Sequence, residues 1–168
     1  GAATTAALRR NTTRIKVGRN EVEWITDGNG YPLQSSGSLR EYFKKARRSS
    51  DEVRAQKDAA GRGMSSDHGG HVVGHRFVKD QGAKNLFPQN DQFNNSAFKI
   101  LENDYARWID GGHEVQFKHV LGDFDPLTGR PGSILVDYEV FDSRGDLVHN
   151  YSQLFPNEAG QQYPRQAR

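Results

Sequence analysis

The stretch NNSAFKILENDYARWIDGG, residues 94–112, carries the strongest helical signal in the chain. Its apolar residues recur at helical spacing and would form one continuous stripe: Ala97, Phe98, Leu101, Tyr105, Trp108 and Ile109. Asn94 or Asn95 can cap its start, and the pair Gly111–Gly112 can end it. The pattern predicts a single amphipathic helix that packs on a core.

On the C-terminal side of this stretch the apolar residues no longer recur at helical spacing but at every second position. Three runs alternate in this way: HEVQFKHV (113–120), SILVDYEVF (133–141) and DLVHNYSQLF (146–155). The joints DPLTGRPG (125–132) and DSRG (142–145) are rich in turn residues. We therefore predict antiparallel strands joined by hairpins over residues 111–156, followed by a loose tail at 157–168.

On the N-terminal side the signals are mixed. Ile15, Val17, Val22 and Trp24 alternate around a Gly-Arg-Asn turn and predict a hairpin. Ser38 with Glu41, and Ser49 with Glu52, have the spacing of capping boxes, and Gly61 can end the second helix. The sequence thus predicts two short basic helices over residues 34–61, within an N-terminal portion that spans residues 1–66.

The composition limits what the chain can be. Its 168 residues suit one α+β domain, and a hydrophobic content of 34% predicts a small core with many loops. The absence of cysteine excludes disulfides and thiolate metal sites. No run approaches the ~18 apolar residues that a membrane span needs, so a membrane is not an expected partner.

The charge is unevenly distributed. Residues 1–66 carry 13 Lys and Arg against 7 Asp and Glu, whereas residues 67–168 carry 10 against 14. One basic cluster lies within residues 9–19, and a second follows the first predicted helix cap: Arg40, Lys44, Lys45, Arg47 and Arg48. The second cluster is our candidate for binding nucleic-acid phosphates, and the alternative is a solvated face.

Residues 65–77, SSDHGGHVVGHRF, hold three histidines: His68, His71 and His75. One interpretation is a zinc site made by these imidazoles and a carboxylate. The other is one histidine that acts as a base beside a hard cation held by oxygen ligands. The second reading is supported by the amide and carboxylate side chains that follow: Asn85, Asn90, Asn94, Asn95 and Glu102.

The order and spacing of three pieces resemble the DNA/RNA non-specific endonucleases of the ββα-metal (His-Me finger) class. The pieces are DHGGH (67–71), NLFPQ (85–89) and FNNSAFKILE (93–102), with Asn85 and Asn94 nine apart and Glu102 eight further on. The run GHVVGHRF (70–77) resembles the branch found at the ends of bacterial polymorphic toxins. The resemblance covers residues 67–110 firmly and the following strands loosely. It implies a ββα-metal core with an antiparallel sheet and additional short helices.

The resemblance also implies roles for single residues. His71 would be the general base, and Asn94 the direct ligand of Mg²⁺, with Mn²⁺ or another divalent cation as alternatives. Glu102 would hold a water on the metal, and Asn85 would support the site from its loop.

This chain departs from the family pattern at one position. The family has Asp three residues before the catalytic histidine, where this chain has His68. We expect Asp67, four residues before, to support His71 through a looser turn, with His68 as the alternative. Arg76 matches the arginine that stabilises the transition state in the toxin branch, and Arg40 is a weaker candidate.

The resemblance implies a metal-dependent endonuclease that cuts DNA, with RNA as a second candidate substrate, and with little sequence preference. The toxin branch implies a secreted or injected bacterial effector domain from a longer protein. Such a domain acts in the cytoplasm of a target cell, and an immunity protein protects the producer. The rival functions are a stand-alone secreted scavenging nuclease, a non-catalytic nucleic-acid-binding module and a zinc-stabilised interaction domain.

Overall fold

The structure is a computed structural model, and it describes residues 9–168. In that part of the chain the strands form two sheets. The larger sheet has the order β1-β2-β3-β6-β7-β8, and every neighbouring pair is antiparallel. Its strands are β1 (Asn11–Val17), β2 (Asn20–Thr26), β3 (Pro32–Leu39), β6 (Glu114–Gly122), β7 (Ser133–Phe141) and β8 (Leu147–Pro156). The smaller sheet pairs β4 (Asp67–His71) with β5 (Leu86–Asn90).

The helices are short. They are α2 (Ser50–Gly61), α3 (His75–Val78), the 3₁₀ turn η1 (Gly82–Asn85), α4 (Asp91–Asn95) and α5 (Ala97–Asp110). None of the helices within residues 9–168 has the length and apolar character needed to traverse a membrane.

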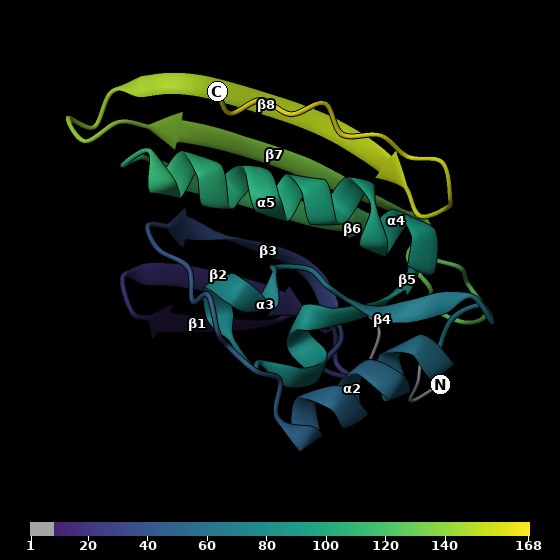
Figure 1. Cartoon of the computed structure of the whole chain (residues 1–168). Helices are drawn as coiled ribbons and strands as arrows, with labels where there is room; N and C mark the ends of the chain where they lie inside the picture. Colours follow the sequence, from purple (N-terminus) through teal and green to yellow (C-terminus); the bar gives the residue numbers. More distant parts are fainter. Residues whose placement is uncertain (1–8) are drawn as a thin grey trace.

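All of these helices and the smaller sheet lie within one stretch of the chain, residues 40–113. This stretch leaves the large sheet after β3 and returns to it at β6, although β3 and β6 are direct neighbours in that sheet. Figure 1 shows the helices and the β4–β5 pair against one face of the large sheet. The predicted site residues of positions 67–102 therefore all belong to one unit mounted on that face.

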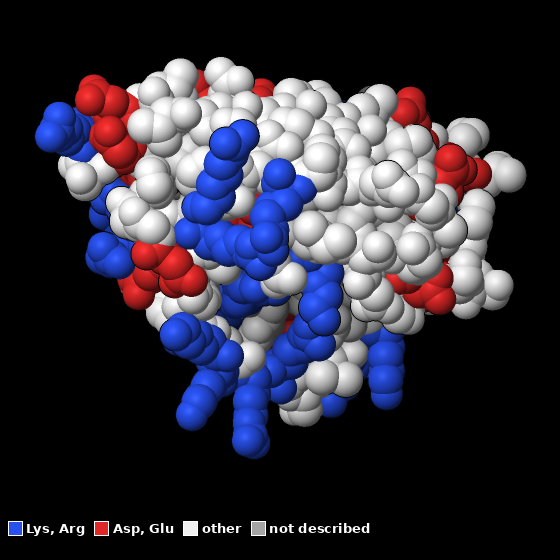
Figure 2. All heavy atoms as spheres, turned by 45° about the horizontal axis from the view of Figure 1, so that its top comes forward, with Lys and Arg blue, Asp and Glu red and all other residues white. Residues whose placement is uncertain are grey.

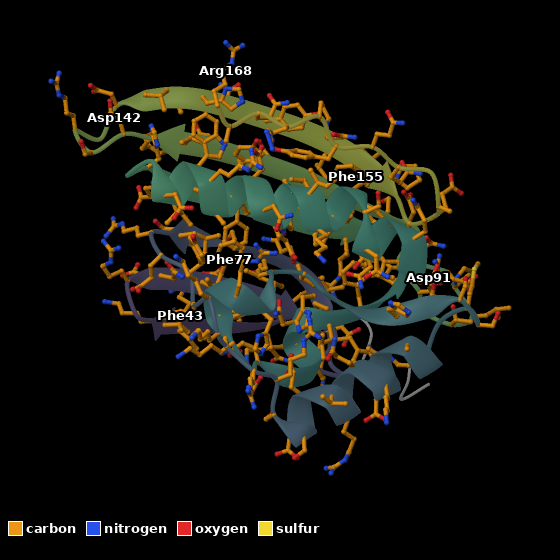
Figure 3. All side chains as sticks on the ribbon, in the orientation of Figure 1. Phe43, Phe77, Asp91, Asp142, Phe155 and Arg168 are labelled. Atoms are coloured by element: carbon orange, nitrogen blue, oxygen red, sulfur yellow. The ribbon has the colours of Figure 1, made fainter. Side chains whose placement is uncertain are left out.

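The core lies between this unit and the sheet. On β7 the inward residues Ile134, Val136 and Tyr138 are buried, while Asp137 between them is exposed, as the period of two predicts. Phe77 of α3 and Phe155 of β8 are fully buried within the layer between helices and sheet (Figure 3). The predicted strands after residue 110 and the hairpin before residue 27 are confirmed.

The prediction of the first of the two N-terminal helices is wrong. Ser38 and Glu41 do not cap a helix, because residues 32–39 form the strand β3, which pairs with β2 on one side and β6 on the other. A Cβ on Gly37 would lie 2.1 Å from the carbonyl oxygen of Glu21, so the small residues of this strand allow close approach of the backbones. Pairing on both edges outweighs the local helical signal here.

The second predicted helix is confirmed. The hydroxyl of Ser49 accepts a hydrogen bond from the backbone N–H of Glu52 at 3.0 Å, and the helix α2 ends at Gly61. The side chain of Glu52 does not return to the N-cap, as a complete capping box would require, but points into the protein.

The predicted helix from residue 94 is divided in two. Asn90 caps α4 by accepting a hydrogen bond from the N–H of Phe93, and α4 ends at Asn95. Ser96 breaks the helix with φ −118° and ψ −96°, and α5 then runs from Ala97. Asn94 therefore lies in the last turn of α4 and is not an N-cap, whereas the predicted end at Gly111 is confirmed.

The C-terminal tail is not loose, contrary to the prediction. The buried carboxylate of Asp104 accepts hydrogen bonds from the hydroxyl of Tyr163 and the backbone N–H groups of Gln166 and Ala167. The hydroxyl of Tyr163 also bonds with that of Tyr138 at 2.6 Å. These polar contacts fasten residues 157–168 to α5 and the sheet, a long-range arrangement that has no local sequence signal.

Candidate active site

A cleft with a volume of about 940 Å³ opens between α2, β4, α3 and the α4–α5 junction. Several of the predicted site residues line it together: His68, His71, Arg76, Asn94 and Glu102. Its other charged lining residues are all basic: Lys44, Arg47, Arg48, Lys57 and Lys99. Figure 2 shows Lys and Arg gathered on the central and lower part of one face, with Asp and Glu mostly toward its sides. Such a cleft suits a polyanionic ligand.

His71 ends β4 at the floor of the cleft and is only 7% exposed. Its Nε2 lies 2.9 Å from Oε2 of Glu52, whose other oxygen accepts a hydrogen bond from the N–H of Gly82 at 2.8 Å. Because an ionised carboxylate can only accept, Nε2 carries the hydrogen. The lone pair of Nδ1 is then left without a partner among residues 9–168.

The charge states of this pair follow from burial and hydrogen bonding. Burial lowers the pKa of His71, and the hydrogen bond and negative charge of Glu52 only partly oppose that effect. Burial by itself would raise the pKa of Glu52, but the hydrogen bonds from His71 and Gly82 outweigh it and hold this pKa below its ordinary value. At neutral pH the pair is therefore a neutral imidazole and an ionised carboxylate.

The glycines of DHGGH explain how the two side chains meet. A Cβ on Gly69 would lie 2.2 Å from the carbonyl oxygen of Gln56, so α2 packs directly on the backbone of β4. The side chain of Gln56 donates a hydrogen bond back to the carbonyl of Gly69 at 3.1 Å. This close approach brings Glu52 of α2 within reach of His71.

Sequence reasoning missed Glu52 as a site residue. It recognised Glu52 only as the fourth position of a capping box, and the hydrogen bond from the backbone N–H of Glu52 to the hydroxyl of Ser49 was predicted correctly. Glu52 contacts His71 only because α2 packs against β4, and no local sequence pattern indicates this packing.

Asn94 and Glu102 face the same cleft from α4 and α5. The Glu102 side chain is 19% exposed, and burial raises its pKa to about 7 against the opposing charges of Arg76, Arg48 and Lys99. Its nearest cation is the guanidinium of Arg76, whose Nη2 lies 3.9 Å from Oε1. Neither Glu102 nor Asn94 has a side-chain hydrogen bond within the described residues. A nearly buried carboxylate and a free amide on one cleft are suitable ligands for a hard divalent cation.

Asn85 lies outside the cleft and is fully buried. Its Oδ1 accepts hydrogen bonds from the N–H of Val73 and from Nε1 of Trp24, and its Nδ2 donates to the carbonyl of Val73. These three bonds of 2.9–3.0 Å fasten the segment after His71 to β2. Asn85 therefore supports the cleft indirectly, because it holds in place the backbone that follows His71.

Asp67 begins β4, at the opposite end of the strand from His71. Its carboxylate accepts hydrogen bonds from Nε and Nη2 of Arg130 at 2.6 and 2.9 Å and from the N–H of Met64. No hydrogen bond in the described residues joins it to His71, so any support it gives is through the position of β4. The other alternative, His68, is exposed at the cleft.

Truncation of Arg130 tests this structural role of Asp67. The pair is almost completely buried, with side-chain exposures of 10% and 0%. Removing one partner of a buried pair leaves the other charge uncompensated, so Arg130→Ala should lower the free energy of unfolding by about 3–5 kcal/mol in urea denaturation. The control is Arg40→Ala, which breaks the exposed Arg40–Glu114 pair and should cost less than about 1 kcal/mol. Equal losses in the two variants would contradict the assignment.

The predicted phosphate-binding residues separate into two groups. Lys44, Arg47 and Arg48 line the cleft, from the loop between β3 and α2. Lys45 is not among the lining residues, and Arg40 lies away from the cleft in an ion pair with Glu114. Sequence reasoning missed Lys57 of α2 and Lys99 of α5, which lie outside the basic clusters of residues 9–19 and 40–48.

One protein-family model and several solved structures are similar to this chain. The sequence model of the family described as DNA/RNA non-specific endonuclease matches residues 10–120. The fold is similar to that of an extracellular endonuclease, with a TM-score of 0.59 and 15% identity over 91% of this chain and 81% of the other. It is also similar to the magnesium-bound structure of NucA from Streptococcus agalactiae, with a TM-score of 0.53 and 10% identity over 90% and 72% of the two chains. No curated protein matches the chain. At these identities the likeness shows the fold, and the predicted α+β architecture with a ββα-metal core is confirmed.

Proposed function

The chain belongs to the DNA/RNA non-specific endonuclease family and is a metal-dependent endonuclease; on that premise we propose how it cuts its substrate. His71 is the general base, and Asn94 and Glu102 are the ligands of a divalent cation. DNA is the proposed substrate, and RNA is a second candidate.

The proposal rests on three side chains that line one cleft. A neutral imidazole, whose Nδ1 has no partner in the described chain, lies in the same cleft as an amide and a carboxylate that also lack hydrogen bonds. Groups in a cleft that have no hydrogen-bond partner in the described chain are available to a ligand, and the carboxylate of Glu102 has only the 3.9 Å ion pair with Arg76. These three groups supply a base and two oxygen ligands.

The proposed reaction is hydrolysis. Nδ1 of His71 takes a proton from a water molecule, and the water oxygen attacks the phosphorus. The bond from phosphorus to the 3′ oxygen breaks, and the departing oxygen takes a proton from solvent water. The products are a 5′-phosphate and a 3′-hydroxyl. The carboxylate of Glu52 stabilises the imidazolium that forms, because it already accepts the hydrogen of Nε2. The guanidinium of Arg76, at the wall of the cleft, is placed to stabilise negative charge on the phosphate.

The cation is proposed to be Mg²⁺, with Mn²⁺ as an alternative, because Asn94 and Glu102 offer only oxygen ligands. When bound, it supplies positive charge to the phosphate and to the leaving oxygen. The magnesium-bound structure of NucA, whose fold is similar, supports this choice.

The basic lining of the cleft supports a substrate recognised by its backbone. Six lining residues are Lys or Arg, and Glu102 is the acidic one among those described. Contacts to phosphates position a nucleic acid without specifying its sequence, so we expect little sequence preference.

Metal removal tests the proposal. The purified protein should degrade plasmid DNA, and RNA if the substrate range extends to it, in the presence of Mg²⁺. EDTA should stop the degradation, and an excess of Mg²⁺ should restore it. Circular dichroism should not change in EDTA, in contrast to a zinc-stabilised domain, which would unfold. Degradation that continues in EDTA would exclude the proposed mechanism, and binding without cleavage would favour a non-catalytic module.

The setting in which the enzyme works is a separate proposal. The extracellular endonuclease with a similar fold supports secretion. The run GHVVGHRF supports an antibacterial toxin that acts inside a target cell and has an immunity protein in the producer. A scavenging nuclease needs no such inhibitor, so the presence or absence of a tight inhibitor in the producing cell separates the two roles.

A further inference from the structure

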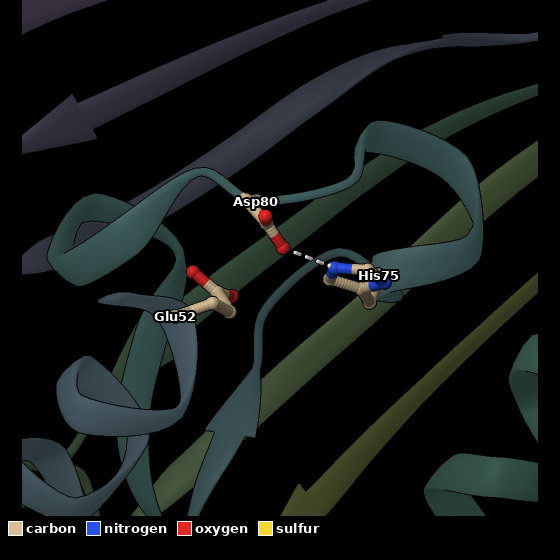
Figure 4. Close-up of side chains that lie close together, drawn as sticks. All are labelled: Glu52, His75 and Asp80. Carbon is tan, nitrogen blue, oxygen red and sulfur yellow. Dashed lines mark hydrogen bonds and ion pairs between the residues drawn. The ribbon is translucent and has the colours of Figure 1, made fainter. Parts of the chain in front are cut away.

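A second group of potential metal ligands lies beside the proposed base. It consists of Glu52 on α2, His75 at the start of α3, and Asp80 just after α3. One ligand atom from each lies within 4.8 Å of the other two, and Nε2 of His75 is 2.6 Å from Oδ1 of Asp80. Figure 4 shows the two carboxylates and the imidazole directed toward one another. We call these three residues the Glu52–His75–Asp80 cluster.

The cluster brings two carboxylates close together. The Glu52 side chain is fully buried, whereas the Asp80 side chain is 36% exposed. The carboxylate of Asp80 accepts a hydrogen bond from Nε2 of His75, and that of Glu52 accepts hydrogen bonds from Nε2 of His71 and the N–H of Gly82. Two carboxylates and an imidazole this close together can be bridged by a bound cation.

The donor set selects the kind of cation. An imidazole nitrogen with two carboxylate oxygens suits Zn²⁺, which binds three protein ligands and leaves a fourth position for water. Mg²⁺ instead prefers a shell of oxygen atoms. Ligand atoms around tetrahedral zinc lie roughly 3.4 Å apart for bonds of about 2.0–2.2 Å, so small side-chain rotations would suffice here. The zinc site considered from the sequence, made by His68, His71 and His75, is not the one that the geometry offers.

We propose that the Glu52–His75–Asp80 cluster is a Zn²⁺ site, distinct from the Mg²⁺ site at Asn94 and Glu102, through which zinc inhibits the enzyme. Oε2 of Glu52 is the partner of Nε2 of His71, and the rings of His71 and His75 are 5.6 Å apart. Zinc in the cluster draws Glu52 away from His71 and places two positive charges beside the base. The inhibition rests on the proposed function, whereas the binding of zinc does not.

The binding test uses zinc alone and the full chain. Isothermal titration calorimetry with ZnCl₂ should give one tight site in the wild type and an affinity at least about tenfold weaker in Asp80→Asn, which changes a partly exposed ligand and should leave the fold intact. Two variants serve as controls. His68→Asn removes an exposed imidazole of the same cleft, and Asn94→Ala removes the proposed Mg²⁺ ligand, so both should bind zinc as the wild type does. Wild-type affinity in Asp80→Asn, or loss of zinc binding in Asn94→Ala, would overturn the proposal.

Two further measurements do not depend on the folding of a ligand variant. X-ray absorption of the zinc-loaded wild type should show an imidazole nitrogen together with oxygen donors, and a shell of oxygen alone would refute the site. Zinc at a concentration that fills the calorimetric site should inhibit Mg²⁺-dependent cleavage by the wild type at least about tenfold, and by Asp80→Asn much less. A protein that binds zinc at the cluster but shows no cleavage without zinc would contradict the proposed nuclease mechanism and leave the zinc site standing.

Discussion

Replacing His71 with alanine is expected to lower the rate of plasmid cleavage by about 10²–10⁴-fold, the range that a positioned general base contributes. The reason lies in the surroundings of the imidazole. Glu52 fixes the hydrogen on Nε2, burial keeps the ring neutral, and Nδ1 has no partner in the described chain. The measurement is the initial rate of supercoiled plasmid loss at saturating Mg²⁺, with circular dichroism to verify the fold.

His68→Ala is the matched control for this variant. His68 lies on the same strand and lines the same cleft, but it is exposed and makes no hydrogen bond within the described residues. Its removal should change the rate by no more than a few-fold. A comparable loss in both variants would mean that His71 acts through the general shape or charge of the cleft. A His71→Ala protein with full activity would exclude it as the base.

The parts of the fold that the sequence predicted are those with a strong local period. β6, β7 and β8 alternate along one covered face, and α5 presents a continuous apolar stripe. β3 lacks such a period, because PLQSSGSL contains few apolar residues and includes Gly37. It is a strand because β2 and β6 pair with it on both sides, and β6 begins more than 70 residues further along the chain.

The grouping of the candidate residues in one cleft was predictable where their spacing along the chain matches the motif. His71, Asn94 and Glu102 were found by motif, and they line one cleft even though the helix between Asn94 and Glu102 is broken at Ser96. Residues whose roles depend on distant partners were missed or assigned differently. Glu52 contacts His71 across 19 residues, and Asp67 binds Arg130 across 63.

The second large effect is expected at Asn94. Its amide lines the cleft from the last turn of α4 and makes no hydrogen bond within the described residues, so Asn94→Ala should remove a metal ligand without loss of structural contacts. Loss of an outer-shell partner alone typically weakens metal binding by 10–100-fold, and loss of a direct ligand should cost at least as much. Calorimetry with Mg²⁺ measures the affinity, and circular dichroism should remain that of the wild type. Cleavage should fall by a similar factor at low Mg²⁺ and recover in part as Mg²⁺ is raised.

The adjacent residue provides the control for this prediction. Asn95 has the same side chain, lines the same cleft and is more exposed, so Asn95→Ala preserves the chemistry of the substitution while sparing the proposed ligand. The Asn95→Ala variant should bind Mg²⁺ and cleave plasmid as the wild type does. If Asn95→Ala instead loses the metal, the ligand lies one position further along the chain, at the last residue of α4. If neither variant changes Mg²⁺ affinity, the cation is held by other groups, and Asn94 is not its ligand.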